Sequence, residues 1–340
     1  GTTGLSNLGN TCFMNSGLQC IAHTTLLRDY LLKGYWKKEL NLTSIHGMKG
    51  KMVKAFVKVL ENLWGENSGP FRPTEFKSVI SKHTPSFEGY HQHDCQEFIA
   101  SLLDGLHEDI NRVPVKKFEE YPDMNKMEDM EAAKTSWDLH IRRENSIIVD
   151  LFYGQYRSIN ICQTCNTKRL NFEPFVYLTL PIPENQEIEV PIQVLLNECI
   201  DEFIKEEILT DENKWFCPEC KEDREAYKKM DIWKAPEILI VHLKRFIQDR
   251  RYYSSRKNNV LVKFPIEGLD LTNIIIGPKS EEKYIYNLYA ISNHSGSTGG
   301  GHYTAYVKNN GRWYDCNDSF VSETSESSIV TSSAYLLFYE

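Results

Sequence analysis

The sequence lacks a hydrophobic run long enough to cross a membrane. Its longest apolar stretches, residues 238–241 and 335–339, have the length of β-strands, so we expect no transmembrane segment. It also lacks an excess of positive charge, because 39 Lys and Arg stand against 47 Asp and Glu and give a formal net charge of −8. Phosphate binding needs a basic field. We therefore expect no nucleic-acid partner, whereas a basic protein partner is compatible with this charge.

A signal peptide and a disulfide framework are also missing. The chain starts at Gly1, inside a motif described below, and we expect it to be an excised domain. Its nine cysteines are an odd number, and 340 residues of which 41% are hydrophobic can build a core without disulfides. This usage predicts a reducing, cytoplasmic compartment in which cysteines bind metal, act as nucleophiles or pack.

The length allows two domains or one large enzyme domain. The first hundred residues carry apolar side chains at helical spacing, which predicts helices within three ranges: 15–34, 53–63 and 98–106. An acidic stretch at 118–131 predicts a surface loop that leads into a helix ending near Asn145.

The second half of the chain is rich in strand-forming residues. The pattern predicts strands at 147–161 and 170–180, then a helix at 191–206. From residue 237 onward it predicts mostly strands, with a polar, glycine-rich loop at 292–301 and a hairpin turn at the Asn-Gly pair 310–311. A helical half followed by a strand-rich half indicates the α+β class.

Two Cys-x-x-Cys pairs stand in the strand-rich half: Cys162 with Cys165, and Cys217 with Cys220. This spacing lets two sulfurs of one turn face the same ion, and four thiolates complete a closed tetrahedral shell for zinc. Because four protein ligands leave no open position, we predict a structural zinc ion. The alternative is four unrelated core cysteines.

Cys12 follows a Gly-Asn-Thr turn and stands where the first helix is expected to begin. The free N–H groups of a helix start lower the pKa of a thiol and could also hold an oxyanion. Gly9 would allow another backbone to approach closely. A cysteine in this place is, by itself, more often a packing residue than a nucleophile.

His302 is the strongest candidate for a general base among the ten histidines. It follows three glycines and begins a strand that runs into the turn at 310–311. If that turn has two residues, Asn317 lies diagonally opposite His302 on the same face of the hairpin, and Asp318 points to the other face. Cys12, His302 and Asn317 then form the set found in papain-like cysteine hydrolases, namely thiolate, base and orienting group.

These segments together resemble the catalytic domain of the ubiquitin-specific proteases. Residues 4–20 (GLSNLGNTCFMNSGLQC) resemble the family's cysteine box, and residues 301–322 (GHYTAYVKNNGRWYDCNDSFVS) resemble its histidine box. The segments QHDCQEF at 92–98, VHLKRF at 241–246 and SAYLLFYE at 333–340 follow the family's order. The resemblance covers nearly the whole chain.

The resemblance implies a role for each matching position. Cys12 matches the nucleophile, His302 the general base and Asn317 the third member of the triad, with the neighbouring Asp318 as a possible substitute for Asn317. Asn7 matches the asparagine whose side-chain amide completes the oxyanion hole with the backbone N–H of Cys12.

Four further positions match the family's substrate-binding residues. Asp94 and Glu97 match acids that grip the carboxy-terminal tail of ubiquitin, which carries arginines ahead of its Gly-Gly end. Without the resemblance, both could simply be acids favoured at the start of a helix. Gly301 and Tyr303 match positions that line the narrow channel for the two glycines.

The resemblance also implies a papain-like fold with the shape of a hand. We predict one catalytic domain, 1–340, that comprises a helical thumb (1–145), mainly fingers (146–235) and mainly palm (236–340). The zinc ribbon would form the tip of the fingers.

The implied function is that of a thiol deubiquitinase, which cleaves the isopeptide bond after the last glycine of ubiquitin through an acyl-enzyme. Its partners would be ubiquitin and ubiquitinated proteins, its catalysis would need no cofactor, and the domain would be monomeric. Two alternatives remain: a ubiquitin-binding scaffold without activity, and a protease for a ubiquitin-like modifier.

Within the family, the segments 104–111, 146–155 and 232–246 most resemble ubiquitin isopeptidase Y and its fungal relatives, an endosome-associated branch. Endosomal recruitment would then depend on regions outside this fragment. We also expect the stretches 248–259 and 292–301 to move and to block the tail channel before substrate arrives.

Overall fold

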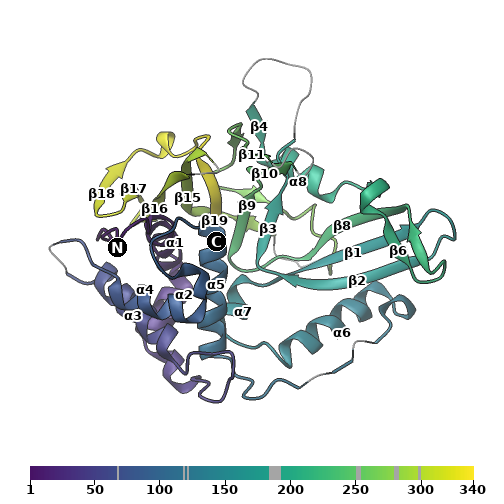
Figure 1. Cartoon of the computed structure of the whole chain (residues 1–340), viewed down its shortest axis with the longest axis horizontal. Coiled ribbons are helices and arrows are strands. Elements are labelled where there is room, and N and C mark those ends of the chain that lie inside the picture. Colours follow the sequence, from purple (N-terminus) through teal and green to yellow (C-terminus); the bar gives the residue numbers. More distant parts are fainter. Residues whose placement is uncertain are drawn as a thin grey trace.

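The structure is a computed structural model that describes residues 1–66, 69–117, 119–120, 122–183, 193–249, 254–278, 283–297 and 300–340. Figure 1 shows the helices of the first 110 residues gathered at one end of the long axis, whereas the helix at 129–141 lies along the strands from the middle of the chain. Strands from the middle of the chain extend to the other end, and the carboxy-terminal strands lie against the helices. None of the helices in the described ranges is both long and apolar enough to cross a membrane.

Most of the helices come from the first 152 residues. They are α1 (Cys12–Ala22), α2 (Thr25–Leu32), α3 (Lys51–Trp64), α4 (Thr74–His83), α5 (Cys95–Asp109), α6 (Asp129–Ile141) and α7 (Ile147–Phe152), and α8 (Leu196–Ile204) follows later. Single 3₁₀ turns occur at Tyr35–Lys38, Pro85–Phe87, Met124–Lys126, Asp211–Asn213 and Glu326–Ser328.

Seven strands form the central sheet, in the order β18-β17-β16-β15-β19-β9-β3. All neighbours are antiparallel except β3 and β9, which are parallel. Their bounds are β3 (Tyr177–Leu180), β9 (Leu239–Leu243), β15 (Leu288–Ser297), β16 (Gly300–Asn309), β17 (Arg312–Asn317), β18 (Phe320–Thr324) and β19 (Ala334–Tyr339).

A second, four-stranded sheet, the distal sheet, has the order β2-β1-β8-β5. It comprises β1 (Gly154–Cys162), β2 (Lys168–Phe175), β8 (Ala226–Lys234) and β5 (Glu207–Leu209). The remaining strands pair two by two: β6 (Trp215–Cys217) with β7 (Glu222–Arg224), β4 (Gln193–Leu195) with β12 (Leu261–Lys263), β10 (Phe246–Asp249) with β11 (Ser254–Lys257), and β13 (Leu269–Asp270) with β14 (Ile285–Tyr286).

The central sheet buries both of its faces, which explains its uninterrupted apolar strands. Ile240 and Phe338 pack with α1 and α5 in one core, whereas their neighbours Val241 and Leu337 pack with α8 in a second core on the other face. Successive side chains of a strand point to opposite faces, so an unbroken apolar run is what a two-sided layer requires.

Two of the predicted elements have different boundaries. The helix predicted within 15–34 is split into α1 and α2, because the chain turns at His23, whose Nδ1 lies 2.7 Å from the carbonyl oxygen of Gln19. The strand predicted at 147–161 begins as helix α7 and continues as β1. Ser146 caps α7 by accepting hydrogen bonds from the backbone of Ile148 and Val149, and this cap overrides the strand preference of the β-branched residues.

The loop predicted at 292–301 is instead largely strand. Strands β15 and β16 stay paired up to Ser297 and Gly300, and residues 298–299 lie outside the described residues. Ser292 is fully buried, and its hydroxyl bonds to that of Ser16 at 2.8 Å, which is why a polar residue is tolerated inside this strand. Likewise, residues 248–249 and 254–257 of the stretch 248–259 pair as strands β10 and β11, and residues 250–253 lie outside the described residues.

The helix predicted at 191–206 is shorter. Residues 193–195 form β4, α8 covers Leu196–Ile204, and residues 191–192 lie outside the described residues. The hairpin turn at 310–311 is confirmed. Asn310 and Gly311 both have positive φ, 49° and 75°, as a type I′ turn requires, and Asn309 faces Arg312.

One cation, Arg245, is fully buried between strands. Its Nε donates to the carbonyl of Ala334 at 2.6 Å, and its Nη1 donates to the carbonyls of Asn258 and Val260 at 2.9 and 2.8 Å. Burial lowers the pKa of this guanidinium to about 10. The side chain thereby joins the start of β19 to the segment between β11 and β12.

We expect Arg245→Lys to destabilise the fold by about 2–4 kcal/mol, because a lysine ammonium cannot replace the planar set of donors and leaves buried carbonyls unpaired. Urea unfolding followed by fluorescence measures this change. Arg312→Lys, at an exposed position of β17, is the matched control and should change the free energy of unfolding by less than about 0.5 kcal/mol. Equal stabilities of the two variants would contradict the role given to Arg245.

Candidate active site

Cys12 is the first residue of α1, as its sequence context predicted. The turn before it is held by Asn7, whose Oδ1 accepts hydrogen bonds from the backbone of Gly9 and Thr11 at 2.9 and 3.2 Å. Gly9 and Asn10 both have positive φ, 107° and 53°. We call residues 7–12 the nucleophile turn. Its geometry brings the free N–H groups of the helix start to the side of the cysteine.

Cys12 is buried, with 3% relative exposure of the residue. Burial raises the pKa of Cys12, and the carboxylate of Asp318 raises it further, whereas hydrogen bonds from the backbone of Tyr303 and Phe13 act in the opposite direction. The lowered pKa expected from the helix start is therefore wrong for the free chain, because desolvation outweighs the helix N–H groups.

His302 and Asn317 lie opposite each other as the hairpin register predicted. The Nε2 of His302 lies 2.8 Å from the Oδ1 of Asn317, so the imidazole carries its proton on Nε2 when neutral and offers Nδ1 as the acceptor. The two residues come from neighbouring strands, β16 and β17. Cys12 reaches the same strand through the backbone of Tyr303, one residue beyond His302.

Asp318 occupies a different place from Asn317. It lies in the two-residue turn between β17 and β18 with φ of 49°. Its carboxylate accepts from the side-chain amides of Asn7 at 2.9 Å and Asn15 at 2.7 Å. In the described residues no hydrogen bond joins it to His302. It fixes the amide of Asn7, whose second N–H is left for another acceptor.

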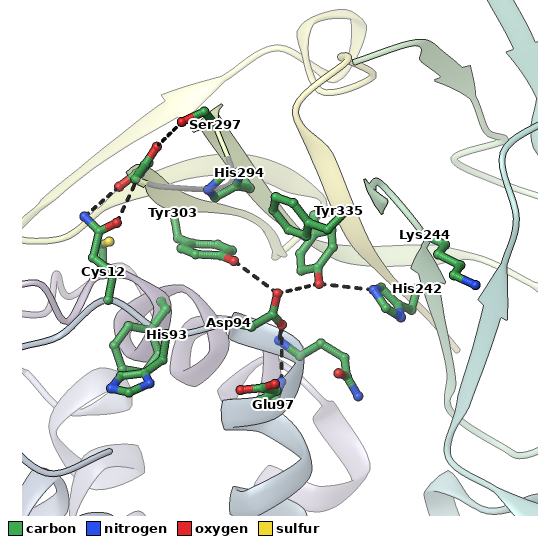
Figure 2. A pocket seen from close by; sticks show the side chains of 16 residues that line it. Cys12, His93, Asp94, Glu97, His242, Lys244, His294, Ser297, Tyr303 and Tyr335 are labelled. Atoms are coloured by element: carbon green, nitrogen blue, oxygen red, sulfur yellow. Dashed lines mark hydrogen bonds between the residues drawn. The ribbon is translucent and has the colours of Figure 1, made fainter. Parts of the chain in front are cut away.

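A cavity of about 510 Å³ opens beside Cys12, and we call it the catalytic cavity. Three of the four predicted substrate-binding residues point into it from different elements (Figure 2): Asp94 and Glu97 from the start of α5, and Tyr303 from β16. The fourth, Gly301, lines its edge. Burial, with a smaller contribution from the charge of Asp94, raises the pKa of Glu97.

Asp94 is already occupied on both oxygens. Oδ1 caps α5 by accepting from the backbone of Gln96 at 2.6 Å, and Oδ2 accepts from the hydroxyl of Tyr335 at 2.6 Å. Figure 2 shows this carboxylate between Tyr303 and Tyr335, with His242 behind it at 3.1 Å from the Tyr335 hydroxyl. Asp94 therefore joins the helical half to the central sheet at the floor of the cavity.

Gly301 pairs with Gln92 across the mouth of the catalytic cavity. The side-chain amide of Gln92 donates to the carbonyl of Gly301 and accepts from its N–H, both at 3.1 Å. A Cβ at residue 301 would come within 2.3 Å of the Nε2 of His294 and 2.5 Å of the carbonyl oxygen of Ser295. Only glycine fits here. The amide of Gln92 occupies the N–H and carbonyl of Gly301, which an incoming extended chain would need for its own hydrogen bonds.

The four predicted metal ligands come together at the tip of the distal sheet. The sulfurs of Cys162, Cys165, Cys217 and Cys220 all lie within 4.8 Å of one another. The backbone N–H of Cys220 donates to the sulfur of Cys217 at 3.5 Å, and the residues after each pair, Asn166 and Lys221, have a φ of 58°. These two tight turns present four thiolates to one point, as a tetrahedral zinc ion requires.

Three residues of the site were missed from the sequence: Asn15, Gln92 and Tyr335. Asn15 is only 2% exposed and stands inside a helix three residues after the nucleophile, a position where a buried amide needs a partner. An asparagine at this position of the helix, one turn after Cys12, could therefore have indicated from the sequence that Asn15 belongs to the site. Nothing in the local pattern of Gln92 or Tyr335 indicates their partners, which lie 209 and 241 residues away along the chain.

The comparisons with known proteins agree with one another. The family model described as "Ubiquitin carboxyl-terminal hydrolase" matches residues 3–339. Ubiquitin carboxyl-terminal hydrolase 2 of Homo sapiens is 40% identical over the whole chain, which covers 55% of that protein. The protein of the same name from Gallus gallus is 42% identical, again over the whole chain, which covers 93% of it. The chain thus spans about half the length of the human relative.

A solved structure described as the SAGA Ubp8/Sgf11/Sus1/Sgf73 DUB module bound to ubiquitin aldehyde has a similar fold. Its TM-score is 0.74 at 27% identity, over 99% of this chain and 69% of the other. The predicted α+β class and the hand-shaped fold are confirmed by this likeness.

The raised pKa of Cys12 gives a testable pH dependence. Deprotonation of the free chain at this residue should have its midpoint above the ordinary value of 9.0, because a raised pKa moves thiolate formation to higher pH. The ultraviolet thiolate absorbance of the wild type minus that of Cys12→Ser measures it and cancels the other eight cysteines. A difference signal already complete at neutral pH would contradict this prediction.

Proposed function

The chain belongs to the ubiquitin carboxyl-terminal hydrolase family, and from this premise we propose that it is a thiol deubiquitinase that cleaves the isopeptide bond after the last glycine of ubiquitin. The observation that carries the proposal is the hydrogen-bonded pair of His302 on β16 and Asn317 on β17, with Cys12 packed against β16. The catalytic cavity beside it is lined by the acids that a tail with arginines would meet, Asp94 and Glu97.

The reaction starts with proton transfer from the Cys12 thiol to Nδ1 of His302, the ring nitrogen that Asn317 leaves free. In the free chain the described residues show no hydrogen bond between this sulfur and the imidazole, so binding of the tail has to tighten this contact. The thiolate then attacks the carbonyl carbon of the terminal glycine. The backbone N–H of Cys12 and the second amide N–H of Asn7 stabilise the oxyanion.

Breakdown of this tetrahedral intermediate breaks the isopeptide bond, and the His302 imidazolium gives its proton to the leaving lysine amine. The acyl group stays on Cys12 as a thioester. His302 then takes a proton from water, whose oxygen attacks the thioester, and ubiquitin leaves with a free carboxylate while the thiol is restored. Asn317 keeps the imidazole oriented in both steps, but it adds no negative charge to stabilise the imidazolium.

The tail reaches Cys12 through the catalytic cavity. Gly301 and Tyr303 both line this cavity from strand β16. Glu97 is the freer of the two acids, because both oxygens of Asp94 have partners within the chain. We therefore assign the direct pairing with arginine mainly to Glu97. Asp94 instead holds α5 in position against the sheet.

The sequence left two other functions open, a ubiquitin-binding scaffold and a protease for a ubiquitin-like modifier. A ubiquitin-binding scaffold without activity is disfavoured, because the residue types of nucleophile, base and orienting group are all present and two of them are hydrogen-bonded. A protease for a ubiquitin-like modifier would use the same chemistry, and only the choice of modifier would distinguish it.

The remaining predictions about the domain belong to the same proposal. A single monomeric catalytic domain divided into thumb (1–145), fingers (146–235) and palm (236–340) is consistent with the helical half and the two sheets. Cytoplasmic localisation agrees with nine cysteines without a disulfide. Kinship with ubiquitin isopeptidase Y and endosomal recruitment rest on three sequence segments only, since the relatives reported above carry the name hydrolase 2.

We further propose that the four clustered cysteines bind zinc. The chemistry of four thiolates within 4.8 Å fits this ion, because four tetrahedral Zn–S bonds of about 2.3 Å place the sulfurs at such separations. When bound, the ion supplies structural cross-linking and no catalytic chemistry, since four thiolates leave no open position. The cysteines would hold the turn between β1 and β2 to the turn of the β6–β7 hairpin.

Cys162→Ser should abolish zinc binding and loosen the tip of the distal sheet. Metal analysis of the purified chain and hydrogen exchange of residues 215–226 measure the two effects. Cys199→Ser, which changes a buried cysteine of α8, is the matched control and should keep its zinc. Unchanged exchange in a zinc-free Cys162→Ser variant would contradict the structural role of the ion.

A ubiquitin probe with a carboxy-terminal electrophile tests the deubiquitinase directly. It should label Cys12 covalently, with a mass increase equal to the probe, and should not label Cys12→Ala. His302→Ala should slow the labelling, because the thiol then lacks its base. Absence of labelling in a folded, zinc-loaded wild-type chain would favour the scaffold, and faster labelling by a probe made from a ubiquitin-like modifier would favour that alternative.

A further inference from the structure

A second cavity, of about 600 Å³, borders the nucleophile turn. We call it the basic cavity. Its walls come from α4, from the segment 85–90 that follows it, and from Leu8. No residue lines both this cavity and the catalytic one. In Figure 1, α4 lies at the end of the long axis opposite the distal sheet, with α1 between them.

Tyr90 separates the two cavities and is tied to the nucleophile turn. Its carbonyl accepts a hydrogen bond from the side chain of Asn10 at 2.8 Å. A Cβ added to residue 9 would come within 2.7 Å of the Tyr90 ring, so the ring packs directly on the backbone of Gly9. Leu8 and Tyr90 face the basic cavity, whereas Cys12 faces the catalytic one. The basic cavity thus begins a few residues from the reacting sulfur.

The charge of this cavity is opposite to that of the whole chain. Three cations line it, Arg72, Lys77 and Lys82, against one carboxylate, Glu88. Lys77 donates to the carbonyl of Phe87. Among the described residues, neither Arg72 nor Lys82 forms an ion pair. On a chain with a net charge of −8, these cations produce a local positive field.

The two sides of the scissile bond need different surfaces. The acyl side, which is the ubiquitin tail, occupies the catalytic cavity with its acids Asp94 and Glu97. The leaving lysine and the protein that carries it must lie on the other side of Cys12. The basic cavity lies outside the catalytic cavity and borders the nucleophile turn, so acidic side chains close to the leaving lysine are placed to reach it.

We propose that the basic cavity binds acidic side chains close in sequence to the modified lysine, so that the chain prefers conjugates whose acceptor lysine stands among Asp and Glu. The proposal rests on the proposed deubiquitinase function and adds a choice of acceptor to it. Arg72 and Lys82 supply the charges, and Tyr90 and Leu8 supply an apolar wall for the lysine stem. Partly exposed ion pairs of this kind change binding by about two- to fivefold each.

The test uses two substrates that differ only in charge. Ubiquitin is joined through an isopeptide bond to the lysine of one short peptide with flanking Asp residues, or of the same peptide with Asn in their place. The ratio of kcat/KM for the Asp substrate to that for the Asn substrate is measured within each enzyme variant, so losses of active protein cancel. We expect a ratio of about 3–10 for the wild type at low salt, falling as salt is added.

The double variant Arg72→Glu with Lys82→Glu should bring this ratio below one, because it replaces both cations with acids. Lys37→Glu with Lys38→Glu makes the same change of net charge on two exposed residues of another surface and should keep the wild-type ratio. A wild-type ratio of one, or a ratio that the first double variant does not lower, overturns the proposal.

A coumarin amide of ubiquitin, which has no peptide on the leaving side, distinguishes this proposal from the one on which it rests. Cleavage of the coumarin amide and of both peptides without preference for Asp overturns the basic cavity as an acceptor site and leaves the deubiquitinase intact. Failure of the wild type to cleave any of the three substrates overturns the deubiquitinase and this inference with it.

Discussion

The contact between helix α1 and strand β16 is the constraint on which the whole site depends. Ser16 donates from its hydroxyl to the carbonyl of Thr304 at 2.8 Å, in a fully packed environment. A Cβ at Gly17 would come within 2.7 Å of the ring of Phe98, so α1 is also held tightly against α5. Cys12 lies one helical turn before Ser16, and His302 lies two residues before Thr304. This partly buried hydrogen bond joins the helix that carries Cys12 to the strand that carries His302 and helps to fix the separation of these two residues.

Sequence reasoning reached the parts of the site that depend on local rules. The Asn-Gly turn fixed the register that pairs His302 with Asn317, and Cys-x-x-Cys spacing identified the clustered cysteines. It failed where distant segments decide the outcome. The stretch 292–301 is polar and glycine-rich, but residues 292–294 are buried, with Ser292 bonded to Ser16 of α1, and residues 292–297 pair with β16 as a strand. The pKa of Cys12 follows from desolvation by the folded chain, which no local pattern records.

The electrostatics of the molecule are organised around the nucleophile turn. Acids lie on the side of the catalytic cavity, and unpaired cations lie on the side of Tyr90. The turn itself is held by neutral amides and by Asp318, whose carboxylate accepts from both Asn7 and Asn15. Burial, with a smaller contribution from the negative charge of Asp318, raises the pKa of Cys12, so the free chain favours the thiol over the thiolate. Reactivity is thus linked to the arrival of a substrate that excludes water and aligns the base.

The pairing of Gln92 with Gly301 has a consequence for the thermodynamics of entry. The side-chain amide of Gln92 uses one donor and one acceptor here, as a peptide unit would, so an extended chain that displaces Gln92 exchanges two hydrogen bonds for two. The number of hydrogen bonds at Gly301 is then the same with Gln92 in place and with the incoming chain in place. The enthalpy of hydrogen bonding at the mouth of the cavity therefore changes little when the chain enters. Residue 301 itself has to be glycine, because a Cβ there would clash with the side chain of His294 and the carbonyl oxygen of Ser295.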